Sequence, residues 1–287
     1  MLIFRLLLGI GLLLGSTIEK SSTQWTNVQS LSFFSKSRNQ KIGFTIYTPP
    51  GYDTGDQNYP VLYFLHGRGG NQFLYWTSIS YEVPDANKDA GAWLNRLIES
   101  DTIPPMIIVA PDDAGGQWGT ENETMVTKEL VSYIDSHYRT ITGRTGRAIE
   151  GFSMGAMGAS RYAADHPGLY CSTIIMADPL PEEQVPSWEA NLKNILDSKL
   201  RVRLVVGEDD PRLDRMVYFD EALTSLGVPH QFEIVPNAGH NVGELYNGVG
   251  VKGLQFHGNC FQQADSNNNP PVMKQFLPLI RSTYNPQ

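Results

Sequence analysis

The chain alternates short apolar runs with segments of helical periodicity. Residues 28–34 and 42–47 alternate apolar with polar side chains, which predicts two antiparallel strands. The later runs are short and mainly apolar, as is typical of strands covered on both faces of a parallel sheet. They comprise residues 60–65, 106–110, 147–150, 172–176, 201–206 and 230–235. The pattern therefore predicts a mostly parallel sheet preceded by antiparallel strands.

The segments between these runs carry apolar residues at three- and four-residue spacing, which predicts helices. They comprise residues 93–99, 125–138, 154–166, 188–198 and 215–226. Residues 271–284 predict a closing helix that Pro278 interrupts. Residues 243–270 are rich in Gly and Asn and predict one long irregular connection. Strands that alternate with helices in this way indicate a single α/β domain with a doubly wound sheet.

The first twenty residues have the pattern of an export signal. Arg5 precedes an apolar run from Leu6 to Leu14, about half of the ~20 residues needed to cross a bilayer. Residues 1–20 are therefore predicted to be a signal peptide, and residues 21–287 the mature α/β domain. We expect a secreted or periplasmic protein without stable membrane insertion.

Composition narrows the possible partners and ligands. The 287 residues are 41% hydrophobic and 18% charged, as in ordinary globular proteins. The formal net charge of −8 disfavours nucleic acid as a partner, because a negative surface repels phosphate backbones. Cys171 and Cys260 are the two cysteines, and whether they pair stays open. Neither they nor the scattered histidines have the spacing of a metal site, so no metal or cofactor is predicted. The sequence does not indicate an oligomeric state.

The strongest chemical motif is Gly-Phe-Ser-Met-Gly at residues 151–155. It follows a predicted strand and precedes a predicted helix, the context in which G-x-S-x-G forms the nucleophile elbow of an α/β hydrolase. Such an elbow is a sharp, strained turn, so the residues two positions before and after the serine must be small. Ser153 is therefore the predicted nucleophile. The start of the following helix would favour negative charge beside it.

A second glycine-rich motif, His-Gly-Arg-Gly-Gly at residues 66–70, follows the apolar run at 60–65. In this fold the loop after the third strand supplies one amide of the oxyanion hole, and the residue after the nucleophile supplies the other. The backbone N–H groups of Arg68 and Met154 are the predicted pair. His66 itself is interpreted as a structural residue that braces the loop.

The general base should follow the last strand, since the chain order in this fold is Ser, acid, His. His240 lies in the loop after residues 230–235, at the edge of the sheet where open α/β sheets bind their ligands. It is the predicted base. His230 precedes that strand and His257 lies in the irregular segment, so neither is favoured.

The acid that orients the base has three candidates, Asp210, Asp209 and Asp178. Glu208, Asp209 and Asp210 are adjacent in the loop after residues 201–206, and Asp210 is favoured among them. Asp209 stays open as an alternative. So does Asp178, which comes after an earlier predicted strand.

Several motifs follow one another in the order found in one esterase family. They are IGFTIYTPPGYD, YPVLYFLHGRGG, IPPMIIVAPDD, KELVSYIDSHYRT, RAIEGFSMGAMGA, LVVGEDDP and PNAGH. Over about residues 30–243 the chain resembles the Putative esterase family of α/β hydrolases, whose members are esterase D-like and feruloyl esterase-like.

The resemblance implies an α/β-hydrolase fold without a separate lid domain. It implies Ser153 as nucleophile, His240 as base, and the amides of Arg68 and Met154 as oxyanion hole. Members of the family often place the acidic Asp three residues after a glycine, an arrangement that Asp210 matches.

Together these residues predict a secreted serine carboxylic ester hydrolase that acts through an acyl-enzyme. We expect a small-molecule or oligosaccharide ester as substrate, and the exported, cofactor-free character favours carbohydrate-linked esters of the feruloyl or acetyl type. Two alternatives stay open: an acyltransferase of the mycolyl-transferase type, and a non-catalytic carbohydrate-binding protein. Trp76, Trp118 and Tyr246 are candidate pocket aromatics, with packing in the core as the alternative interpretation.

Overall fold

The computed structural model describes residues 21–82 and 88–261, whose strands form one nine-stranded sheet. The order across the sheet is β1-β2-β3-β5-β4-β6-β7-β8-β9. The strands are β1 (Ser21–Ser22), β2 (Val28–Ser35), β3 (Gln40–Tyr47), β4 (Val61–Leu65), β5 (Ile107–Pro111), β6 (Arg147–Phe152), β7 (Ser172–Met176), β8 (Arg201–Gly207) and β9 (His230–Val235). The predicted signal peptide (1–20) and closing helix (271–284) lie outside the described residues.

Strand pairing divides the sheet into two parts. β2 and β3 pair antiparallel along their whole length, and β3 joins β5 antiparallel. The pairs β4–β5, β4–β6, β6–β7, β7–β8 and β8–β9 are all parallel. The predicted α/β-hydrolase sheet, mostly parallel with antiparallel strands at its start, is therefore confirmed. The strand order reverses at β4, so the loops at its carboxyl end open a crevice suited to a ligand.

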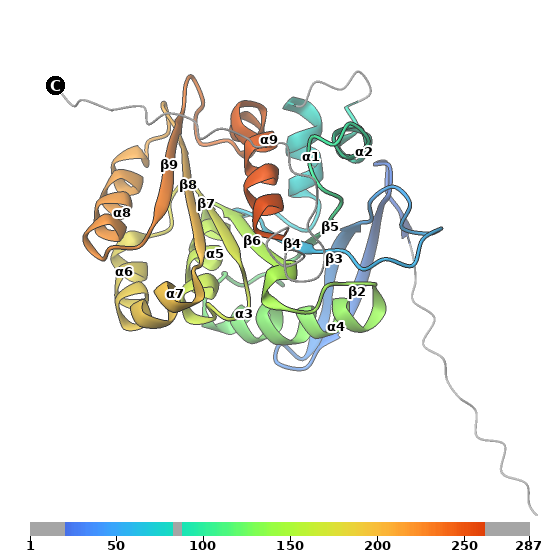
Figure 1. The fold of residues 1–287 in the computed structure, drawn as a ribbon, viewed down its shortest axis with the longest axis horizontal. Helices are drawn as coiled ribbons and strands as arrows, with labels where there is room; N and C mark the ends of the chain where they lie inside the picture. The colour runs from blue at the N-terminus through green and yellow to red at the C-terminus, as the bar shows by residue number, and fades with distance from the viewer. Residues whose placement is uncertain (1–20, 83–87, 262–287) are drawn as a thin grey trace, which may run out of the picture.

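Helices cover both faces of the sheet (Figure 1). One face carries α1 (Leu74–Glu82), α2 (Ala90–Glu99) and α9 (Val242–Phe261), whose apolar side chains share one core cluster. The other cluster holds side chains from the remaining longer helices. The chain's other helices are α3 (Thr120–Thr124), the π-helix η1 (Met125–Leu130), α4 (Val131–His137), the 3₁₀-helix η2 (Arg144–Gly146), α5 (Met154–Asp165), α6 (Pro181–Ala190), α7 (Leu192–Ser198) and α8 (Leu213–Ser225).

The central strands explain why the two cores form. Every residue of β4, β5, β6 and β7 is buried. Because successive strand residues point to opposite faces, β4 sends Tyr63 and Leu65 into one core and Leu62 and Phe64 into the other. A strand that must satisfy two apolar layers has to be apolar at consecutive positions, which is the pattern that the sequence carries.

The predicted irregular connection at residues 243–270 is wrong over all of its described length, residues 243–261, and its remaining residues lie outside the described ones. Residues 242–261 form α9, a helix of 20 residues that packs on the sheet. Its buried apolar residues lie at helical spacing, among them Val242, Leu245, Tyr246 and Val249. Its glycines are packing positions: a Cβ at Gly258 would lie 2.6 Å from the Pro104 ring. Glycine therefore brings the helix close to its neighbours here, rather than breaking it.

Two predicted helices are also divided differently. The segment predicted at 125–138 begins earlier, with α3, and passes through the π-helix η1 before α4. The segment predicted at 188–198 consists of the end of α6 and all of α7, which meet at Asn191. The Asn191 side chain donates to Asp165 Oδ1 at 3.0 Å, an alternative to continued helix that favours a break.

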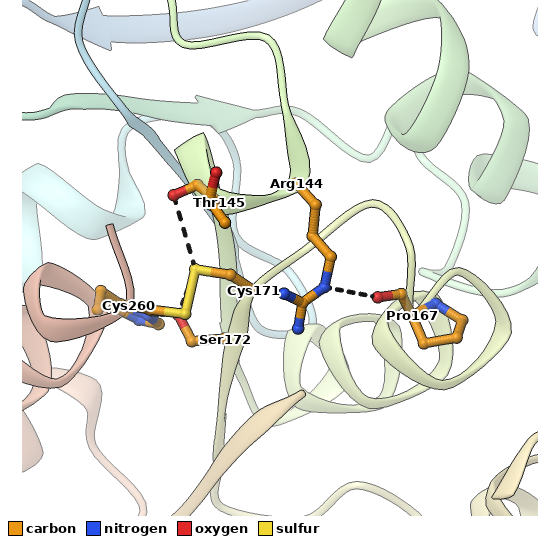
Figure 2. The surroundings of a disulfide bond; sticks show 7 residues. Arg144, Thr145, Pro167, Cys171, Ser172 and Cys260 are labelled. Atoms are coloured by element: carbon orange, nitrogen blue, oxygen red, sulfur yellow. Dashed lines mark hydrogen bonds between the residues drawn. A yellow bond between two sulfur atoms is a disulfide. The ribbon is translucent and has the colours of Figure 1, made fainter. Parts of the chain in front are cut away.

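The two cysteines, whose pairing the sequence left open, form a disulfide bond. Cys171 directly precedes β7 and Cys260 lies in the last turn of α9, with their Cα atoms 6.1 Å apart. Figure 2 shows the bond beside Ser172 and the Thr145 carbonyl. The disulfide therefore ties the end of α9 to the amino end of the central sheet.

Candidate active site

Ser153 sits in a strained turn between β6 and α5. Its backbone has φ 55° and ψ −118°, a conformation that residues other than glycine rarely adopt. The two flanking glycines make this turn possible, because a Cβ at Gly151 would collide with the Gly155 backbone, and one at Gly155 with the Leu65 carbonyl. The Ser153 N–H donates to the Met176 carbonyl at 2.8 Å, which holds the turn against the end of β7. The predicted strand–turn–helix geometry around Ser153 is present.

Two hydrogen bonds join Ser153 to the predicted base and acid. His240 Nε2 lies 2.9 Å from Ser153 Oγ, and His240 Nδ1 lies 2.7 Å from Asp210 Oδ2. Because a carboxylate can only accept, Nδ1 carries the proton and Nε2 is left to accept from the serine hydroxyl. The Asp210 side chain is fully buried, whereas that of His240 is 23% exposed. The imidazole can therefore meet a ligand while its acid is screened from water.

The turn after β8 holds Asp210 in place. The Arg212 N–H donates to Asp210 Oδ1 at 2.9 Å, so both carboxylate oxygens are occupied. At the start of the turn, a Cβ on Gly207 would collide with the Ala238 carbonyl in the loop that carries His240. Glycine therefore lets the acid loop and the base loop approach each other.

The two alternative acids lie elsewhere. Asp178 Oδ2 accepts from Arg212 Nε at 3.1 Å and from Arg215 Nη1 at 3.0 Å. Asp209 is exposed, and its backbone N–H donates to the Ala238 carbonyl. The structure thus brings Asp210, and neither of its competitors, to His240.

The base is anchored by the start of α9. Asn241 Oδ1 accepts from the Gly243 N–H at 2.8 Å, which makes Asn241 an N-cap for this helix. Glu244 Oε2 accepts from the Gly239 N–H at 2.7 Å, so the first turn of α9 also holds the residue that precedes the base. The ring of Phe152 lies 4.8 Å from that of His240. These supporting side chains were not predicted, although Asn followed three residues later by Glu is a helix-start signal.

The loop at residues 66–70 packs against the elbow. His66 is buried and bonds at both ring nitrogens: Nδ1 lies 2.8 Å from the Gly67 carbonyl, and Nε2 accepts from the Asp113 N–H at 3.3 Å. A carbonyl can only accept and an amide can only donate, so the ring is neutral with its proton on Nδ1. This geometry agrees with the structural interpretation of His66.

The two predicted oxyanion amides belong to the two segments, loop and elbow, that pack together. Arg68 is exposed in the turn that the Gly70 N–H closes onto the Gly67 carbonyl, and Met154 is the first residue of α5. Amides in the first turn of a helix have no partner within it and can serve an anion. A Cβ on Gly67 would lie 3.1 Å from the Phe152 ring, so the loop and the elbow are in close contact.

Asp113 supports the same loop from the end of β5. Burial raises the pKa of its carboxyl, and the Gly115 N–H, which donates to Oδ1 at 2.9 Å, opposes that rise. The loop is tied further by Trp118, whose indole N–H donates to the His66 carbonyl at 2.8 Å.

The candidate pocket aromatics are core residues. Trp76 and Trp118 are fully buried, and Tyr246 is 4% exposed. The Tyr246 hydroxyl donates to the buried Glu150 carboxylate, and burial followed by the charge of Glu150 raises the pKa of this phenol. The packing interpretation therefore fits all three.

The two disfavoured histidines have structural partners. His257, a residue of α9, is fully buried, with Nδ1 2.8 Å from Ser172 Oγ and Nε2 3.3 Å from Glu150 Oε2. His230, the first residue of β9, places Nε2 2.7 Å from Oδ1 of Asp220 in α8. Neither contacts Ser153.

Among residues 21–82 and 88–261, no three His, Cys, Asp or Glu side chains are grouped as a metal site requires. Every helix in that part of the chain is too short or too polar to span a bilayer.

Comparison with known proteins points to esterases. The family model described as Putative esterase matches residues 35–242. An esterase of Mycobacterium tuberculosis (strain H37Rv) is 32% identical over 148 residues, which are 48% of this chain and 29% of that protein. An endo-1,4-beta-xylanase/feruloyl esterase of Xylanibacter ruminicola is 29% identical over 157 residues, 50% of this chain and 20% of its own length. The chain therefore spans less than a third of these curated relatives.

Solved structures share the whole fold. A ferulic acid esterase superposes with a TM-score of 0.69 at 26% identity, covering 82% of this chain and 98% of its own. An S-formylglutathione hydrolase of Staphylococcus aureus superposes with a TM-score of 0.58 at 15% identity, covering 79% and 97%. At that lower identity, the second likeness concerns the fold alone.

Proposed function

Because the chain belongs to the Putative esterase family, we propose that it is a serine carboxylic ester hydrolase. The observation that carries the proposal is the chain of hydrogen bonds from Asp210 through His240 to Ser153 Oγ. The strained backbone of Ser153 supports it further, since α/β hydrolases present their nucleophile on such a turn.

The first half-reaction would form an acyl-enzyme. Ser153 Oγ attacks the ester carbonyl carbon while His240 Nε2 takes the hydroxyl proton. The resulting imidazolium is stabilised by the buried Asp210 carboxylate. The amides of Arg68 and Met154 donate to the oxyanion of the tetrahedral intermediate. Its collapse breaks the C–O bond to the alcohol, which leaves with the proton from His240.

The second half-reaction would return the enzyme. His240 takes a proton from water, the water oxygen attacks the acyl carbon, and the bond between that carbon and Ser153 Oγ breaks as Oγ regains the proton from His240. The products are the carboxylic acid and the free serine. No metal or redox partner is needed to balance either step.

We extend the proposal to the substrate and to export. The ferulic acid esterase and the xylanase/feruloyl esterase among the similar proteins support feruloyl esters of carbohydrates as substrates, with acetyl esters as the second candidate type. The apolar run in residues 1–20 supports a signal peptide, with residues 21–287 as the exported domain.

Active-site labelling tests the nucleophile. Ser153→Ala should lose hydrolysis of an aryl acetate by orders of magnitude and lose stoichiometric labelling by an organophosphonate, with little change in thermal midpoint. His240→Ala should lose hydrolysis of the aryl acetate to a similar extent. Ser225→Ala, an exposed serine on α8, is the matched control and should behave as the wild type. Full labelling of Ser153→Ala would contradict the assignment.

A substrate panel tests the specificity. Feruloylated and acetylated oligosaccharides are compared with simple aryl esters, and the products are identified with and without an added alcohol acceptor. We expect free acid as the main product and a preference for the carbohydrate esters. Transfer to the acceptor as the main outcome would favour the acyltransferase, and no turnover of any ester would favour the carbohydrate-binding alternative.

Processing tests the export proposal. The full chain is produced in a bacterial host, and the intact mass of the protein outside the cytoplasm is measured. We expect a mass lowered by about twenty N-terminal residues. An uncleaved chain retained in the cytoplasm would contradict the signal peptide.

A further inference from the structure

A cavity of about 380 Å³ lies at the amino end of the parallel strands, the edge opposite Ser153. It is bounded by the end of α7, the starts of β8 and β9, and one side chain of α9. The lining residues are Ile195, Leu196, Lys199, Leu200, Arg201, Val202, Pro229, His230, Gln231 and Phe256. Its volume is within the range of small-ligand sites, roughly 300–1,000 Å³.

The walls of this cavity are mainly apolar. Ile195, Leu200 and Val202 are buried behind it, and Phe256 closes one side. Leu196 lines the cavity yet is 41% exposed, which makes it one of the few large apolar side chains at the surface of the described residues. A ligand with an apolar body would cover this surface and gain about 25 cal/mol for each Å² removed from water.

One cation in the wall lacks an acidic partner. The Arg201 guanidinium lies over the Phe256 ring at 4.8 Å from its centre, and within the described part of the chain no carboxylate pairs with it. Burial lowers the pKa of Arg201. By contrast, Arg203, two residues further along β8, pairs with Glu233. Among the described residues, Arg201 is therefore a partly desolvated positive charge with which no carboxylate counter-ion pairs.

The neighbouring polar groups do not supply that counter-ion. Asp220, the nearest acidic partner of a lining residue, is engaged by His230. Lys199 adds a second positive charge at the rim. In a chain of net charge −8, the described wall of this cavity is thus locally positive.

The cavity is held open by fixed elements. The Arg201 N–H donates to the Cys171 carbonyl at 3.0 Å, and Cys171 is bonded to Cys260, one turn beyond Phe256 on α9 (Figure 2). The disulfide therefore fixes the helix that carries the Phe256 wall against the strand that carries Arg201. A site that is already formed loses little conformational entropy when a ligand binds.

We propose that this cavity binds a small carboxylate with an apolar body, such as a medium-chain fatty acid. Arg201 receives the carboxylate, since a guanidinium can donate two parallel hydrogen bonds to it. The apolar chain lies against Leu196, Leu200 and Phe256. The site is separate from Ser153 and does not depend on the proposed esterase activity.

Ligand-observed NMR titration with octanoate tests the site, with octanamide as a neutral probe of the same length. The full chain is first treated with an organophosphonate to occupy Ser153, and labelling is checked by mass. If no label is taken up, the proposed activity is in question, and the titration proceeds on untreated protein. We expect saturable octanoate binding with a Kd of about 1 mM or below, as befits ten heavy atoms. Octanamide should bind about tenfold more weakly.

Variants place the binding at the cavity. Arg201→Gln should weaken octanoate binding about tenfold and leave octanamide unchanged, because only the charged contact is lost. Leu196→Trp should weaken both probes by filling the cavity from its exposed side. Lys193→Gln, which removes an exposed cation of α7 that does not line the cavity, is the control and should change neither. Octanoate binding that is absent, or equal in Arg201→Gln and wild type, would overturn the proposal.

A further variant tests whether the chain fills its own cavity. Residues 262–287 follow α9 and include the apolar residues Phe276 and Leu277. The double variant Phe276→Ser/Leu277→Ser should bind octanoate with the wild-type Kd. Binding that is detected only in this variant would overturn the proposal in favour of a cavity covered by the C-terminal segment.

Discussion

The turns after β7 and β8 each carry a buried aspartate, and the two carboxylates have different neighbours. Asp210, after β8, is 4% exposed and faces the imidazole of His240. Asp178, after β7, is 8% exposed and faces the guanidinium groups of Arg212 and Arg215. A candidate catalytic acid, Asp210, and a member of a structural ion pair, Asp178, are therefore both buried. Both also lie at the carboxyl edge of the sheet.

Backbone geometry separates the two turns. Around Asp178 three residues adopt positive φ, at Ala177 (56°), Asp178 (82°) and Leu180 (55°), and none of them is glycine. The turn that leads to Asp210 instead starts at Gly207, where the Ala238 carbonyl leaves no room for a Cβ. The first turn is strained and held by ion pairs, whereas the second lets two loops approach closely. Close approach to the base loop, more than burial, therefore distinguishes Asp210 from Asp178.

Removing the charge of Asp210 should have the largest effect. Asp210→Asn should lower kcat/KM about 10⁴-fold, as for the equivalent change in serine proteases, because the amide favours the wrong imidazole tautomer. Steady-state kinetics on an aryl ester would measure it, with circular dichroism as the control for folding. A loss of less than tenfold would show that another group orients His240.

Crowding the turn before Asp210 should have the next largest effect. Gly207→Ala places a Cβ against the Ala238 carbonyl, so the acid and base loops must separate. We expect about a 10²-fold loss of kcat/KM from the misplaced acid. Overpacking should also lower the free energy of unfolding by about 1–3 kcal/mol.

Gly168→Ala is the matched control, since nothing lies within 4 Å of a Cβ at that position. It should keep the wild-type rate. If Gly207→Ala were as active as Gly168→Ala, close approach of the two loops would not explain the role of Asp210.

The sequence predicted most of this arrangement because its signals are local. The parallel strands are apolar at consecutive positions, and the motif of the elbow consists of five adjacent residues, 151–155. The choice among carboxylates was harder, because Asp209 and Asp210 are neighbours in sequence and only the course of the turn separates them in space. Helix α9 was missed because a segment rich in glycine has the composition of a loop. Its glycines can be understood as packing positions only when the residues that they contact in the folded chain are known.

Neutralising Asp178 should affect stability more than rate. Asp178→Asn removes the charge that Arg212 and Arg215 share, which should lower the free energy of unfolding by about 1–3 kcal/mol. The kcat/KM should fall less than about tenfold, since the Arg212 N–H still donates to Asp210. Urea unfolding and steady-state kinetics would measure the two effects. A rate loss close to that of Asp210→Asn would erase the distinction between the turns.

Changing Asp209 should have the smallest effect, although it adjoins Asp210 in sequence. Its side chain is exposed, and the bond that ties residue 209 to the Ala238 carbonyl comes from the backbone N–H, which Asn retains. Asp209→Asn should therefore change kcat/KM by less than about twofold, well within the ~1.4 kcal/mol that a tenfold change represents. The same aryl-ester assay, run beside Asp210→Asn, would measure it. Should Asp209→Asn prove the more damaging of the two, the turn would have to present residue 209 to His240, and the acid would need to be reassigned.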